Sequence, residues 1–232
     1  MSDPSPSSLV PDPELTEAIA GRAAALRDRI AILTDRSVRL VCVTKGHPVE
    51  VAAAALAAGC SDLGESYAQE LVPKATALAD ATAAHDVRTP TWHFIGRLQT
   101  NKVRSLVGIV HVWHTVDRES LAVELAKRAP GAQVLVQLDL AGLAGRGGCP
   151  PGDAPGLVQR CEMLGLEVRG LMGVGVPGAP EDARPGFRLL SSMADDLGLV
   201  ERSMGMSADL EVAVEEGATI VRVGTTLVGA RP

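Results

Sequence analysis

Aromatic side chains are scarce in this chain of 232 residues, where Phe, Trp and Tyr together make up 2%. Basic residues are also outnumbered, with 22 Lys and Arg against 28 Asp and Glu and a formal net charge of −6. A nucleic-acid-binding surface normally needs positive charge for the phosphates and aromatic rings for base stacking. The composition therefore argues against nucleic-acid partners. Apolar residues still make up 46% of the chain, so we expect a globular protein with an aliphatic core.

Long apolar runs are absent too. The longest, Val51 to Ala58, falls far short of the roughly 20 residues that a membrane span requires, so we expect no membrane partner. Residues 1–13 are rich in Ser and Pro and show neither the basic start nor the apolar stretch of a signal peptide. We expect a flexible tail over 1–13 and one domain over 14–232. The four cysteines show no C-x-x-C spacing, which favours reduced thiols in a cytoplasmic protein.

Short apolar segments alternate with helical segments along most of the chain. Before them, apolar residues at helical spacing from Leu15 to Leu33 predict one amphipathic helix. The strand candidates cover residues 38–44, 61–63, 92–96, 109–116, 133–140, 166–174, 201–204 and 218–224. Such alternation predicts parallel strands with right-handed crossovers. Eight units predict an α/β fold, a single (β/α)8 TIM-type barrel with an extra N-terminal helix; a doubly wound open sheet is the alternative.

Three of the predicted helices bear on the site. One covers Ser66 to Leu78, one is capped by Asp117 and runs to Arg128, and one begins at Ser207 and ends at Glu216. In a barrel of this type the functional residues lie at the carboxyl ends of the strands. Those ends carry Lys45, Glu65, His93, His114, Asp139, residues 204–207, Arg222, Gly224 and Thr225.

Lys45 closes the apolar strand candidate 38–44. Burial of a lysine lowers its pKa and makes the neutral amine available as a nucleophile. Taken alone, however, Lys45 is more simply explained as a lysine at the wet edge of its strand.

Arg222 lies inside the last strand candidate, where an unpaired guanidinium would be very costly. Its hydrogen bonds need an acceptor, which is either a barrel carboxylate such as Glu65 or a ligand at the barrel mouth. Gly224, Thr225 and Ser207 follow the last two strands, where this architecture commonly holds phosphate. Capping a helix is the ordinary role of a serine placed like Ser207.

Two other sequence patterns do not indicate a binding site. His111 and His114 suggest a metal pair, but residues three apart on a strand face opposite ways, so we expect no metal. The glycines between residues 142 and 152 do not follow a strand in a G-x-G-x-x-G pattern, which excludes a dinucleotide fingerprint.

A lysine on the first strand, a buried arginine and phosphate donors on the last two strands together suit a phosphorylated aldehyde. Six segments between residues 43 and 231 carry a resemblance to a known family: VTKG (43–46), GESYAQE (64–70), WHFIGRLQTNK (92–102), HTVDR (114–118), GLMGVG (170–175) and the C-terminal stretch 203–231. The chain resembles the pyridoxal 5′-phosphate homeostasis proteins, single-domain relatives of the alanine racemase N-terminal barrel.

That resemblance implies pyridoxal 5′-phosphate (PLP) as the cofactor and assigns roles to individual residues. Lys45 corresponds to the lysine that holds PLP as a Schiff base, and Arg222 to the arginine that faces the pyridine nitrogen. The phosphate ligands correspond to Ser207, Gly224 and Thr225. Met206, His93 and Ser66 complete the expected cofactor-binding set. The chain departs from the family at Ser66 and Asp139, where Asn is usual, and over the glycine-rich residues 141–149.

Three functions are compatible with such a site. The chain is a non-catalytic carrier or buffer of PLP, a PLP-dependent amino-acid racemase or related enzyme, or a barrel that binds another phosphorylated metabolite. A guanidinium only donates hydrogen bonds, so Arg222 keeps the pyridine nitrogen neutral and weakens it as an electron sink. By the resemblance, racemases with such an arginine add a tyrosine from a further domain, whereas Tyr67 is the only tyrosine here.

We therefore expect a PLP carrier that supports vitamin B6 and amino-acid homeostasis without substantial catalysis of its own. The expected catalytic set is empty. The expected partners are PLP and PLP-dependent apoenzymes, and we expect a monomer.

Overall fold

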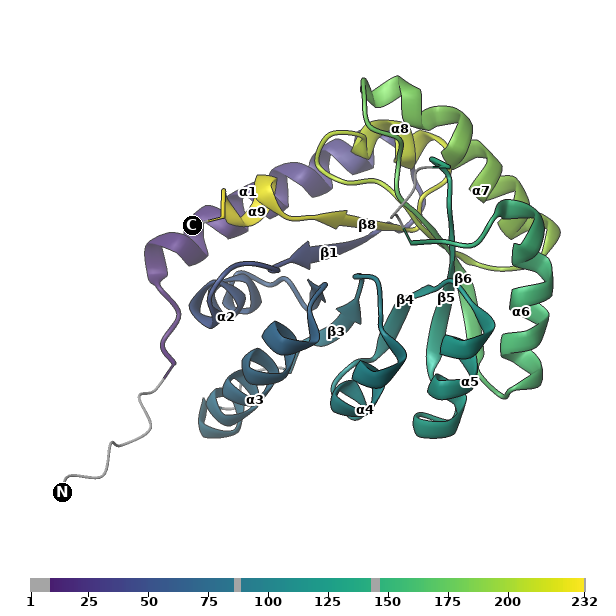
Figure 1. The fold of residues 1–232 in the computed structure, drawn as a ribbon. Coiled ribbons are helices and arrows are strands. Elements are labelled where there is room, and N and C mark those ends of the chain that lie inside the picture. The colour runs from purple at the N-terminus through teal and green to yellow at the C-terminus, as the bar shows by residue number, and fades with distance from the viewer. Residues whose placement is uncertain (1–8, 86–88, 143–146, 232) are drawn as a thin grey trace.

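The computed structural model describes residues 9–85, 89–142 and 147–231. Its eight strands form a closed barrel in which each strand runs parallel to its neighbours, in chain order, and β1 closes against β8 (Figure 1). The strands are β1 (Arg39–Val43), β2 (Asp62–Glu65), β3 (Thr91–Phe94), β4 (Val112–Val116), β5 (Gln133–Leu138), β6 (Glu167–Gly173), β7 (Glu201–Ser203) and β8 (Ile220–Val223). The predicted (β/α)8 barrel is confirmed, and the open sheet is wrong.

Helices surround the barrel on its outside (Figure 1). They are α1 (Pro13–Leu33), α2 (Val49–Ala57), α3 (Ala68–His85), α4 (Val103–Leu106), α5 (Glu119–Arg128), α6 (Ala154–Met163), α7 (Arg184–Asp196), α8 (Leu210–Glu215) and α9 (Thr225–Val228), with short 3-10 turns η1 (Thr100–Lys102), η2 (Pro151–Asp153) and η3 (Pro180–Ala183). The additional helix α1 packs against α2, α8 and α9. Among the described residues, no helix combines the length and apolar character that crossing a bilayer would require.

The additional helix begins two residues before the predicted apolar pattern, at Pro13, the last residue of the predicted tail. The Asp12 carboxylate accepts hydrogen bonds from the backbone N–H groups of Glu14 and Leu15, and Pro13 occupies the first helical position. The buried face of α1 consists of Ile19, Ala23, Leu26 and Ile30. Residues 1–8 of the predicted tail lie outside the described residues.

Side chains alternate between the inside of the barrel and the layer under the helices, because successive residues of a strand point to opposite faces. A small apolar cluster inside the barrel takes one side chain from each of five strands: Val41, Val112, Leu135, Met172 and Ile220. The larger core lies between strands and helices and includes Leu40, Cys42, Val221 and Val223. On β1 and β8 the alternation therefore assigns Lys45 and Arg222 to the inner face.

Three predicted helix starts are wrong. α5 has Arg118 rather than Asp117 at its cap position, and Asp117 instead accepts hydrogen bonds from the Arg118 guanidinium and from the N–H of Gly148. α8 begins at Leu210, so residues 207–209 form a turn and Ser207 does not start the helix. α3 begins at Ala68 rather than at Ser66. Of the glycine-rich stretch, residues 143–146 lie outside the described residues.

Candidate functional site

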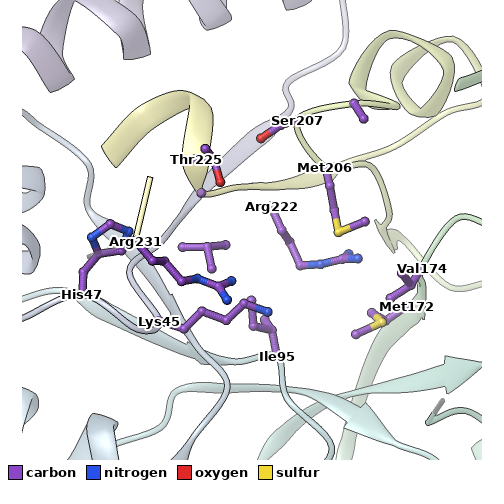
Figure 2. Close-up of a pocket in the computed structure, with 13 residues that line it drawn as sticks. Lys45, His47, Ile95, Met172, Val174, Met206, Ser207, Arg222, Thr225 and Arg231 are labelled. Carbon is purple, nitrogen blue, oxygen red and sulfur yellow. The ribbon is translucent and has the colours of Figure 1, made fainter. Parts of the chain in front are cut away.

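A cavity of about 380 Å³ opens at the carboxyl end of the barrel (Figure 2). Its ionisable lining groups are all basic, and none of the described Asp or Glu residues lines it. Its lining comprises Val43, Lys45, His47, Ile95, Met172, Val174, Met206, Ser207, Ala208, Arg222, Gly224, Thr225 and Arg231. The side chains of Lys45, Arg222 and Arg231 extend toward the same space in Figure 2. Such a cavity favours an anionic ligand.

Lys45 lies in the loop that follows β1. Burial lowers the pKa of its ammonium group, and the nearby charges of Arg231 and Arg222 lower it further. A lower pKa increases the fraction of neutral amine near pH 7, and the neutral amine is the nucleophilic form. The next residue, Gly46, has φ +73, and a Cβ there would lie 2.9 Å from Cδ of Arg231. Glycine at this position therefore lets Arg231 pack beside Lys45.

Arg222 projects from β8 into the barrel and is only 4% exposed. Its guanidinium donates hydrogen bonds to Ser203 Oγ (2.7 Å) and to the Gly173 carbonyl (2.9 Å). Burial lowers the pKa of Arg222 to about 10, so it stays protonated at neutral pH. A guanidinium carries five N–H groups, so these two acceptors leave others available, and Arg222 is one of the cavity-lining residues.

Glu65 is not the partner of Arg222, and that alternative is wrong. The Glu65 carboxylate accepts hydrogen bonds from Thr44 Oγ1 (2.7 Å) and from Lys74 Nζ (2.6 Å) of α3. Strand alternation explains the difference: Thr44 and Glu65 face the helix layer, whereas Arg222 faces the barrel interior. The buried arginine and the buried glutamate thus belong to different layers of the protein.

Hydroxyl groups and backbone line the upper wall of the cavity in Figure 2. Ser207 lies in the turn before α8, and Gly224 is the cap residue of α9, whose first residue is Thr225. The Asp209 carboxylate accepts a hydrogen bond from the N–H of Met206 at 2.6 Å and thereby closes the 206–209 turn. Asp209 is not among the lining residues, although its charge acts on the cavity residue Arg222 and raises the pKa of Arg222 against the effect of burial.

Two of the predicted cofactor-binding residues are not among the lining residues. His93 lies deeper inside the barrel, where its ring nitrogens contact His114 and Asp62. Ser66 follows β2, and its carbonyl is so close to Gly96 that a Cβ on Gly96 would lie 2.1 Å from it. The other six predicted residues line one cavity: Lys45, Met206, Ser207, Arg222, Gly224 and Thr225.

The sequence interpretation missed the other basic groups of the cavity, His47 and Arg231. His47 lies two residues beyond Lys45, and its pKa is lowered by burial and by the charges of Lys74 and Arg231. Arg231 approaches Lys45 only because α9 returns the C-terminal residues to the barrel mouth. No local pattern in the sequence indicates that approach.

The donor set fits a phosphorylated aldehyde. Basic groups, hydroxyls and backbone suit a phosphate, the amine of Lys45 suits a carbonyl carbon as a nucleophile, and the buried guanidinium of Arg222 suits a hydrogen-bond acceptor on the ligand. Val43, Ile95, Met172 and Val174 supply apolar walls for a flat ring. The residues present therefore satisfy each part of such a ligand.

Comparisons with known proteins agree with this geometry. A family described as "Alanine racemase, N-terminal domain" matches residues 17–232. The pyridoxal phosphate homeostasis protein of Pseudomonas aeruginosa is 39% identical over 227 residues, covering 94% of this chain and 96% of that protein. The Aquifex aeolicus protein of the same name is 40% identical over 205 residues, covering 83% and 87%. The structure of PipY from Synechococcus elongatus with PLP bound superposes with a TM-score of 0.77 at 32% identity, covering 91% of this chain and 100% of PipY.

Proposed function

The chain belongs to the alanine racemase N-terminal domain family, and from this premise we propose that it binds PLP as a carrier and not as an amino-acid racemase. Relatives similar over nearly their whole length are named pyridoxal phosphate homeostasis proteins, and PipY has a structure with PLP bound. The observation that carries the proposal is the cavity itself. It places one desolvated lysine amine among basic groups and hydroxyls, with no carboxylate among the described lining residues.

Each part of the cofactor has a matching group. Lys45 would hold the aldehyde carbon through Nζ, while Ser207, Gly224 and Thr225 would hold the phosphate with hydroxyl and backbone N–H groups. Arg222 would donate a hydrogen bond to the ring nitrogen. When bound, PLP supplies an electrophilic carbonyl and an electron-withdrawing ring.

The basic character of Arg222 disfavours catalysis. PLP enzymes that form carbanions usually hold the ring nitrogen protonated with a carboxylate. Arg222 remains a cation at neutral pH and has no acceptor site, so it would leave the ring nitrogen of bound PLP unprotonated. This arrangement weakens the ring as an electron sink and favours storage of the cofactor over its chemical use.

A racemase also needs a second proton-transferring group across the substrate from the lysine. Tyr67 is 45% exposed, lies just before α3 and is not among the cavity-lining residues. His47 does line the cavity, but it follows Lys45 by two residues in the same loop. His47 therefore comes from the same loop as Lys45 and not from an element on the other side of the barrel mouth.

Release of the cofactor to PLP-dependent apoenzymes would support vitamin B6 and amino-acid homeostasis. The monomeric state and the cytoplasmic location stay predictions.

A spectrum and an exchange assay test the proposal together. Purified protein mixed with PLP should gain a visible absorption band, and borohydride reduction followed by peptide mapping should place the adduct on Lys45. The same protein with L-alanine in D2O should show at most trace α-proton exchange by NMR. A kcat within the usual enzyme range of roughly 1–10³ s⁻¹ would establish the racemase alternative instead. Absence of the band would favour another phosphorylated ligand.

A further inference from the structure

Buried polar side chains form a continuous line through the barrel interior, starting behind the cavity at Arg222. The line continues through Ser203 of β7, His114 of β4 and His93 of β3, all three fully buried, to Asp62 of β2. Asp62 is the first residue of its strand, as Arg39 and Glu201 are of theirs. The amino ends of parallel strands meet at one end of a barrel, so the line joins the cavity to the opposite end.

Every neighbouring pair in the line is within hydrogen-bond distance. Arg222 lies 2.7 Å from Ser203 Oγ, and Ser203 Oγ lies 3.0 Å from His114 Nδ1. His114 Nε2 lies 2.8 Å from His93 Nδ1, and His93 Nε2 lies 2.9 Å from Asp62 Oδ1. Four consecutive contacts therefore connect a guanidinium to a carboxylate.

With both imidazole rings neutral, the two ends determine the direction of all four hydrogen bonds. A guanidinium only donates and an ionised carboxylate only accepts. His93 therefore donates from Nε2 to Asp62 and, when neutral, accepts at Nδ1 from His114. His114 then donates from Nε2 and accepts at Nδ1 the hydroxyl proton of Ser203. Because Ser203 donates its hydroxyl proton to His114, its oxygen accepts the hydrogen bond from Arg222.

We propose that Ser203, His114, His93 and Asp62 are positioning residues, a one-directional hydrogen-bond relay that holds the guanidinium of Arg222 in its place at the cavity. The relay makes a carboxylate at the far end of the barrel part of the cofactor site. Its consequence for PLP rests on the proposed function, whereas the hydrogen-bond directions do not.

The charges around the line agree with these protonation states. Burial lowers the pKa of His114 well below its usual value, and the charges of Arg222 and Arg39 lower it further, so His114 stays neutral. Burial alone would raise the pKa of Asp62, but hydrogen bonds from His93 and Ser61 outweigh it and keep the pKa below the usual range. Both groups therefore keep the required form near pH 7.

The surroundings of the two ends differ. No carboxylate of the described chain lies within ion-pair distance of Arg222, and Asp209 acts on it only from farther away. At the other end, Asp62 lies 3.8 Å from Arg39, which in turn lies 3.5 Å from Glu201, and His111 lies nearby on the same side. Asp62 is 18% exposed and lines a second cavity there. The relay is thus anchored at an accessible carboxylate.

Nitrogen-15 NMR of the histidine rings tests the relay in the protein without PLP. Long-range ¹H–¹⁵N correlation should show His93 and His114 as neutral Nε2–H tautomers at neutral pH. Asp62→Asn removes the acceptor-only end, so it should mix the tautomers of both rings, while Asp195→Asn on the surface should change neither. An Nδ1–H tautomer or a doubly protonated ring in the unaltered protein would overturn the relay. This experiment needs no cofactor, so it separates the relay from the proposed function.

Cofactor binding tests the positioning role. Ser203→Ala should raise the Kd for PLP about tenfold, since it removes one acceptor of the guanidinium, and Asp62→Asn should raise it about threefold. Because both act through Arg222, the double variant should bind no more weakly than Ser203→Ala alone. Ser192→Ala, on the exposed surface, is the matched control. Thermal unfolding would check that each variant is folded. The proposal would be refuted if the double variant raised the Kd by the product of the two single increases, or if Asp62→Asn left the Kd unchanged.

Discussion

Replacing Lys74 with methionine removes the ammonium group that contacts the buried carboxylate of Glu65. Lys74 is 5% exposed, and its Nζ lies 2.6 Å from Glu65 Oε1 and 2.9 Å from the carbonyl of Thr44. Glu65 is 0% exposed, and its second oxygen, Oε2, has no hydrogen-bond partner among the described residues. The Lys74→Met variant would therefore keep a buried carboxylate with the Thr44 hydroxyl as its contact. Removing one member of a buried ion pair costs about 3–5 kcal/mol of unfolding free energy.

Urea unfolding followed by circular dichroism measures that loss directly. A protein of this size should also lose roughly 6–20 °C in Tm for the same free energy. Lys102→Met, at an exposed lysine, is the matched control and should change the free energy by less than about 0.5 kcal/mol. Adding Glu65→Gln to Lys74→Met should restore much of the stability, because it removes the unpaired charge. A Lys74→Met variant within about 1 kcal/mol of the unaltered protein would refute the reasoning.

The pH dependence of that loss has a definite sign. Burial raises the pKa of Glu65, although the hydrogen bond and charge of Lys74 oppose the effect. Without Lys74 the pKa rises further, so the folded protein binds a proton at pH values where the unfolded chain has released it. The free energy of unfolding of Lys74→Met therefore falls as the pH rises from the ordinary pKa of a glutamate to the raised pKa of Glu65 in the folded protein. The Lys74→Met defect should therefore be largest near neutral pH and shrink toward acid pH.

The remaining predictions concern the cavity. Lys45→Ala should abolish the visible band of bound PLP, and a borohydride adduct mapped to Lys74, Lys102 or Lys127 would contradict the assignment. Ser207→Ala should weaken PLP binding by roughly ten- to a hundredfold, the equivalent of about 1.5–3 kcal/mol, and should leave the weaker binding of pyridoxal unchanged. An equal loss of affinity for PLP and for pyridoxal would show that Ser207 does not contact the phosphate. The rate of PLP attachment should rise with pH around a midpoint below that of an ordinary lysine, and Arg231→Gln should move this midpoint upward, because Arg231 lowers the pKa of Lys45.

Much of the fold follows from local patterns. All eight strand candidates became strands, with ends shifted by up to three residues, because buried parallel strands are apolar runs between amphipathic helices. The roles proposed for Lys45 and Arg222 also have a local origin. Arg222 lies on the inward-facing set of β8 and Lys45 continues that of β1 two residues beyond the strand, and a buried basic residue requires either a partner or a ligand.

Helix starts depend on more than local pattern. Asp117 and Ser207 are good capping residues, yet Asp117 contacts Arg118 and Gly148, and Ser207 lies in a turn closed by Asp209. Capping preference contributes only about 1 kcal/mol, so tertiary contacts override it.

The partners of buried polar groups were decided by tertiary structure alone. Sequence separation and residue type allowed Glu65 to pair with Arg222, but the pair lies in two different layers, and Lys74 takes the glutamate. His93 has the right position on its strand for the cavity and instead joins His114 and Asp62. Arg231 reaches Lys45 only through the last turn of the chain. Which inward side chains meet across a barrel depends on how far neighbouring strands are staggered when the sheet closes. That stagger is a property of the whole ring of eight strands, and no single segment encodes it.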